Sequence, residues 1–234
     1  MASRKTETIA HAFWRAAGGR ARFGCPVNIG KAAPRVLPVA ILRLNGLDTS
    51  VVSQLLGDAG ADPWASSLRR PLRGCLIADA GKAMILVDGD DPEDQQRMTI
   101  AHEVAHFLLH YLKPREDAVT AFGPDVLAVL DRTRPPTPGE RFSAALRNVP
   151  IDPFRHAMDR EPLHRRSVAA IEDDADDLAI ELIAPWKEVK ALANTTPGVL
   201  RERYGLPSDI ALKIAALLQP SGTSRGVLGL FGEK

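Results

Sequence analysis

Two histidines and a glutamate within five residues are the strongest chemical signal in the sequence. His102 and His106 are four residues apart, so on an α-helix their imidazoles project from one face, about one turn apart. A single tetrahedral Zn²⁺ can bind both. Glu103 is rotated by about 100° from His102, where it is not a ligand but can accept a proton from a water that the zinc activates. The pattern predicts a zinc-dependent peptidase.

The alternative is a chance match, which we expect in roughly one chain in a hundred of this length and histidine content. The surrounding residues favour a site. His102 and His106 interrupt an otherwise apolar helix, and imidazoles buried without partners destabilise a core by several kcal/mol. A bound metal removes that penalty.

A catalytic zinc site needs a third protein ligand. His110 is the nearest candidate, but two helical turns, roughly 12 Å, separate it from His102. A ligand from a second helix is easier to arrange. Glu172 and Asp176 share one face of a dense acidic helix at i and i+4, so one carboxylate could bind metal while the other orients a histidine. Alternatively, this acidic turn only complements the helix dipole.

Periodicity and helix breakers predict the elements that position these residues. The central expectation is a helix from Pro92, at its first position, to Leu112, stopped by Pro114. A hairpin of residues 74–78 and 83–87 should precede it. The remaining expectations are a strand at 36–44 and helices at 5–17, 48–56, 125–130, 140–147, 168–181, 199–204 and 208–218.

Composition restricts the function classes. The formal net charge of +1 gives no reason to expect nucleic acid as a partner. No stretch approaches the roughly 20 apolar residues that span a bilayer, so we expect no membrane association. Cys25 and Cys75 are isolated, which argues against a disulfide framework and favours a reducing, cytoplasmic setting.

Charge and proline content divide the chain into three expected parts. Residues 1–35 form a basic N-terminal segment, which we interpret as solvated and partly mobile. Residues 36–218 form the peptidase domain, interrupted by a proline-rich insertion at 113–168. Residues 219–234 form a C-terminal tail. The oligomeric state stays open.

Two blocks of sequence resemble the ImmA/IrrE-type zinc metallopeptidases. Residues 96–110, Gln-Arg-Met-Thr-Ile-Ala-His-Glu-Val-Ala-His-Phe-Leu-Leu-His, are similar to that family's histidine block, and residues 172–185 to its downstream acidic block. The resemblance implies that Glu172 is the third zinc ligand and that Asp176 lies behind the ligands. His110 recurs in the family block and could line the cleft or serve packing. The resemblance also implies an α+β, zincin-like fold with a small, mostly antiparallel sheet beside an active-site helix pair.

The same resemblance implies an intracellular endopeptidase. Family members commonly cleave helix-turn-helix repressors in bacterial cells, releasing stress-response genes, so a repressor-like protein is the expected substrate. Two alternatives stay open: a regulatory binding module in which zinc only stabilises the fold, and DNA binding through residues 198–218. We do not expect direct nucleic-acid binding, because short amphipathic helix pairs are usually packing elements.

Overall fold

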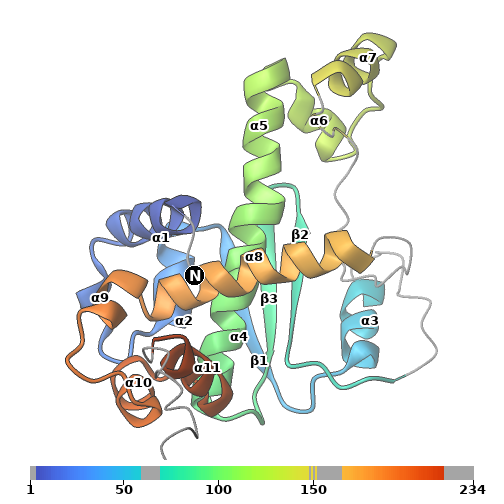
Figure 1. Ribbon diagram of the computed structural model, residues 1–234. Coiled ribbons are helices and arrows are strands. Elements are labelled where there is room, and N and C mark those ends of the chain that lie inside the picture. The colour runs from blue at the N-terminus through green and yellow to red at the C-terminus, as the bar shows by residue number, and fades with distance from the viewer. Residues whose placement is uncertain (1–3, 59–68, 148, 150, 152–164, 219–234) are drawn as a thin grey trace, which may run out of the picture.

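The computed structural model describes residues 4–58, 69–147, 149, 151 and 165–218 (Figure 1). The fold is α+β. A small sheet lies beneath a long helix, and a second long helix crosses the first (Figure 1). None of the helices described is long and apolar enough to cross a membrane.

The sheet has three strands in the order β1-β3-β2. The predicted hairpin is present, with β2 antiparallel to β3, but β1 pairs with β3 in parallel. The sheet is therefore mixed, and the expectation of a mostly antiparallel sheet is wrong for β1. A parallel pair needs a crossover, and residues 45–73, which include helix α3, connect β1 to the hairpin. The strands are β1 (Val39–Leu44), β2 (Gly74–Asp79) and β3 (Lys82–Asp88), and α3 spans Thr49–Asp58.

The helix that carries the histidines is longer than predicted. α4 (Glu93–His106) runs into a π-helical turn, η2 (Phe107–Leu112), and then into α5 (Lys113–Phe122) without a break. Pro92 is the N-cap of α4 and not its first residue. Pro114 does not stop the helix: it is the second residue of α5 and directly follows the π-helical turn.

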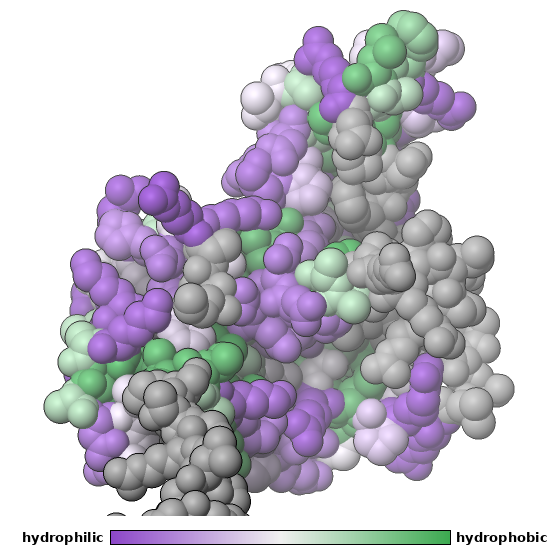
Figure 2. Space-filling model, viewed as in Figure 1, coloured by the Kyte–Doolittle hydropathy of each residue, from purple (hydrophilic) through white to green (hydrophobic). Residues whose placement is uncertain are grey.

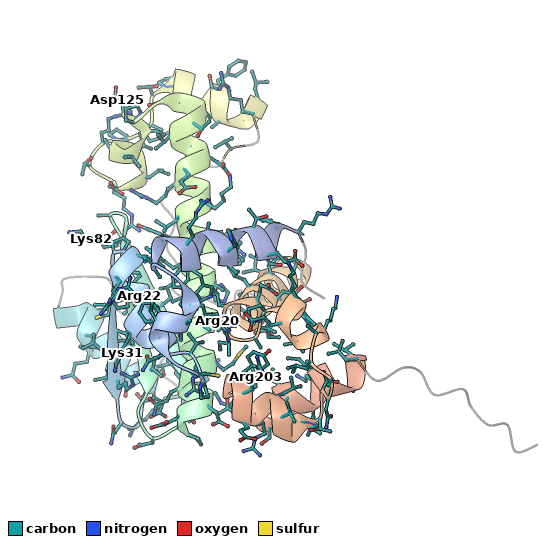
Figure 3. The ribbon with its side chains drawn as sticks, turned by 90° about the vertical axis from the view of Figure 1, so that its left-hand side faces the viewer. Arg20, Arg22, Lys31, Lys82, Asp125 and Arg203 are labelled. Atoms are coloured by element: carbon teal, nitrogen blue, oxygen red, sulfur yellow. The ribbon has the colours of Figure 1, made fainter. Side chains whose placement is uncertain are left out.

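The described part of the basic N-terminal segment packs into the main core, which corrects its interpretation as a solvated segment. Its helices are α1 (Arg4–Ala16), η1 (Arg20–Phe23) and α2 (Ile29–Val36). The apolar face of α1 buries Phe13 and Trp14, and the Trp14 Nε1–H donates to the carbonyl of Leu182 at 3.1 Å. Figure 3 shows Arg20, Arg22 and Lys31 on this part of the molecule. The basic side chains of this segment therefore do not prevent its helices from burying their apolar residues in the core.

The second long helix, α8 (Arg165–Ile183), crosses α4 and also packs against α1. Short helices follow it, and the predicted pair near the C-terminus is present. They are α9 (Trp186–Lys190), α10 (Pro197–Tyr204) and α11 (Ser208–Leu218). The tail, 219–234, lies outside the described residues.

The described part of the insertion forms an arm, defined here as α5, α6 (Val126–Leu130) and α7 (Pro138–Arg147). The arm extends away from the α4–α8 crossing (Figure 1). It has a small apolar cluster of its own, made of Ala118, Val126, Leu130, Ala144 and Ile151. Both short helices predicted in the insertion are present.

Candidate metal centre

Three potential metal ligands converge where α8 crosses α4. The Nε2 atoms of His102 and His106 are 2.9 Å apart. One carboxylate oxygen of Glu172, Oε2, lies 3.2 Å from the first and 3.6 Å from the second. Ligands of a tetrahedral zinc, bound at about 2.0–2.1 Å, lie about 3.3 Å from one another. One ion at the centre of these three atoms therefore fits with little movement.

Buried small side chains on both helices are compatible with a close crossing. Ala101 and Ala105 on α4 and Ala175 and Ala179 on α8 are all fully buried in the main core. The separation of packed helices depends on the side chains at their contact, and alanine permits a close approach. The short carboxylate side chain of Glu172 can then reach the histidines of α4.

Asp176 lies one turn after Glu172 and contacts the other side of the His102 ring. Its Oδ1 is 2.8 Å from His102 Nδ1, so the Nδ1–H can donate to the carboxylate. That hydrogen bond selects the tautomer whose Nε2 carries a lone pair, which is the form that binds a metal. The structure thus brings Asp176 to the place that the sequence predicted for an orienting group.

Glu103 is buried, with 3% of its surface exposed, and its Oε2 has no hydrogen-bond partner among the described residues. Burial raises the pKa of this carboxyl, while the neighbouring His102 and His106 oppose the rise. A buried carboxylate oxygen without a donor is unfavourable by itself. It is suited to a site where a metal and a water supply the missing positive charge and the missing proton.

Gly74, at the start of β2, makes room for Thr99 and lies close to Glu103, and sequence reasoning did not single it out. A Cβ at Gly74 would clash with Thr99 Cγ2 and would lie 3.2 Å from the Leu86 carbonyl oxygen and 3.3 Å from Glu103 Oε1. A glycine at a strand end often marks the close approach of another group, which is the signal that was available in the sequence.

In the metal-free cluster, the surroundings of His102 favour its protonated form. Hydrogen bonds from His102 and His106 hold the pKa of Glu172 well below its usual range. Burial disfavours charge on His102, but hydrogen bonds to Asp176 and Glu172 dominate and raise the pKa of His102 to about 10. The metal-free cluster therefore binds a proton that zinc has to displace.

His110 does not join the three ligand atoms. Its Nδ1 lies 3.1 Å from His106 Nδ1, whereas His106 directs its Nε2 at His102. The expectation that a second helix supplies the third ligand atom agrees with this geometry. His156 and His164 lie outside the described residues.

Comparison with known proteins agrees with the resemblance. Residues 62–128 match the family model of peptidase M78, described as the IrrE N-terminal-like domain. The resemblance to the ImmA/IrrE-type family is confirmed over these residues. The match includes β2, β3 and the helix with His102, Glu103 and His106, but it ends before α8. No curated protein and no solved structure matches the chain. The M78 family is one of metallopeptidases, and Glu172 lies outside the matched residues.

Proposed function

We propose that the protein is a zinc-dependent endopeptidase that cleaves a repressor-like regulatory protein. The observation that carries the proposal is the convergence of His102, His106 and Glu172 beside the unpartnered carboxylate oxygen of Glu103. A structural metal site needs no base beside its ligands. A buried carboxylate without a donor has a chemical use in hydrolysis.

Each residue has a distinct role in this proposal. His102, His106 and Glu172 hold the zinc, and Asp176 keeps the His102 ring in its binding orientation. Zinc, when bound, polarises a carbonyl and lowers the pKa of water to near neutrality. Glu103 accepts the proton of the attacking water and then passes it to the leaving amine, a task that its raised pKa favours.

The substrate class rests on the resemblance to ImmA/IrrE-type peptidases and is an analogy at the level of the family. The site has an approach from solvent on the side of α8, because the side chain of Asp176 is 57% exposed and that of Glu172 is 36% exposed. This opening is compatible with a polypeptide substrate.

The substitution Glu103→Gln tests the proposal, because it preserves shape and removes the base. Zinc content and fold should be unchanged, while cleavage should fall by about 100-fold or more. Crosslinking and co-purification with the inactive variant in its native host should capture the substrate. Glu116→Gln is the matched control, since Glu116 is an exposed acid of α5.

The competing function is a binding module that controls a transcription factor by contact. A cellular reporter of the captured repressor, beside a gel for its fragments, separates the two. Relief of repression by Glu103→Gln as strong as that by the wild type, with no fragments from either, would contradict the peptidase.

A further inference from the structure

His110 and the π-helical turn beside the ligands are not used by the proposed reaction. The turn η2 begins at Phe107, directly after the ligand His106, and His110 lies within it. Isolated π-helical turns inside α-helices occur frequently at functional sites. The ring centroids of His106 and His110 are 5.2 Å apart, with the planes at 49°. This places the two Nδ1 atoms within hydrogen-bond distance, at 3.1 Å.

Packing holds the π-helical turn in place. Tyr111 is buried, its ring stacks on Phe107 at 5.3 Å between centroids, and its hydroxyl oxygen accepts the N–H of Gly81 at 2.9 Å. Arg115 lies over the Tyr111 ring and pairs with Asp131 at 2.7 Å. The turn is thereby attached to the tip of the β2–β3 hairpin, so the position of His110 follows from the fold.

The chemistry of metal binding decides the direction of the His106–His110 hydrogen bond. A neutral imidazole has one N–H and one lone pair. If His110 donated to His106 Nδ1, the proton of neutral His106 would be on Nε2, the atom that faces the other ligands. Zinc binding through Nε2 therefore requires His106 to donate from Nδ1 and His110 Nδ1 to accept. The proton of neutral His110 is then on its own Nε2.

We propose that His110 is a positioning residue that holds His106 in its zinc-binding tautomer and ring orientation. It does for His106 what Asp176 does for His102, and it lies in a π-helical turn that the packing of Tyr111 holds in place. The inference rests on the proposed zinc site. Partners behind metal-ligating histidines commonly change metal affinity by 10–100-fold when they are removed.

Zinc affinity, measured by competition with a chelator, tests this role without any substrate. His110→Ala should bind zinc about 10–100-fold more weakly than the wild type. His110→Asn should recover most of the loss, because its amide oxygen can accept the same hydrogen bond. His11→Ala, at an exposed histidine of α1, is the matched control and should bind zinc like the wild type.

A measurement on the wild type is independent of how the variants fold. ¹⁵N NMR of the zinc-loaded protein should show His106 protonated at Nδ1 and His110 protonated at Nε2. Unchanged affinity of His110→Ala, or a proton on His110 Nδ1, overturns the positioning role and leaves the peptidase proposal intact. A wild type that binds no zinc overturns the proposed function itself.

Discussion

The α4–α8 crossing and the arm are built in different ways, although one continuous helix joins them. The ligands at the crossing lie at the edge of the main core, where His106 is buried and the side chains of His102 and Glu172 are partly exposed. The arm has a small separate cluster, and on α7 it exposes Phe142 and Leu146, at 67% and 72%. Figure 2 shows this apolar surface at the end of the arm. The site therefore depends on how the two long helices pack. None of the three proposed ligands comes from α5, α6 or α7.

The strongest test of the site at the crossing is the removal of Glu172, which provides the proposed ligand from α8. Glu172→Ala should abolish stoichiometric zinc binding, because two histidines alone leave the site incomplete. Metal analysis of the purified protein measures this. Asp173→Ala, at the exposed neighbouring position, should keep one zinc per chain. The opposite pattern would mean that Asp173 and not Glu172 is the ligand.

Asp176 should have a smaller effect, because it acts through His102. Asp176→Ala should weaken zinc binding by about 10–100-fold without abolishing it, and Asp176→Asn should recover part of the loss. The chelator competition used for His110 measures both variants. If Asp176→Ala binds zinc with wild-type affinity, the 2.8 Å contact between Asp176 and His102 is only a surface ion pair with no role in metal binding.

Gly74 tests whether the position of Glu103 depends on the sheet. Gly74→Ala should destabilise the protein by about 1–3 kcal/mol, as overpacking does, and should reduce cleavage more than zinc binding. Thr99→Ser removes the methyl group that the new Cβ would meet. The double variant should therefore regain part of the stability, which denaturant unfolding can show as a coupling between the two sites. Gly198→Ala, where the new Cβ meets nothing, is the control.

The charge on His102 predicts a pH dependence of the metal-free protein. The folded pKa of about 10 lies above the usual value of 6.5, so protonated His102 stabilises the fold fully below pH 6.5. This stabilisation is lost as the pH rises through about 10. His102→Gln should remove that part of the slope in the free energy of unfolding between these pH values. Zinc affinity should rise over the same window, because the competing proton is lost. An unchanged slope in His102→Gln would contradict the raised pKa.

The smallest effect is expected from the arm. Phe142→Ser with Leu146→Ser should leave zinc affinity and the unfolding of the main core unchanged, because both side chains are exposed and far from the ligands in the fold. Weakened zinc binding in this double variant would show that the arm and the crossing are coupled.

The sequence predicted the features that depend on local spacing. The helix with His102 and His106, the hairpin and the acidic helix all follow from periodicity over a few residues. Features that depend on distant partners were not predictable. Nothing near β1 indicates that it joins β3 in parallel, and nothing near Phe13 or Trp14 indicates that α8 covers them.

Local rules also failed where the helix itself departs from regularity. The expectation that Pro114 ends the helix assumes uniform α-helical geometry, whereas a π-helical turn precedes α5. The i, i+4 spacing places the rings of His106 and His110 on one face, but it does not determine that their two Nδ1 atoms meet. In this site, residue types were predictable and their mutual orientation was not.

The arm lies between the two ligand helices in sequence, so a zinc ion held by His106 and Glu172 would close a loop of chain that contains it. Folding has to close this loop to bring the ligands together, at a chain-entropy cost of about 4 kcal/mol for a loop of this size, in the description used for disulfides. The entropy of loop closure grows only with the logarithm of length, by about 0.6 kcal/mol for each doubling. A long connection between the two ligand helices is therefore compatible with a tight site, because its length hardly affects the free energy of bringing Glu172 to the histidines.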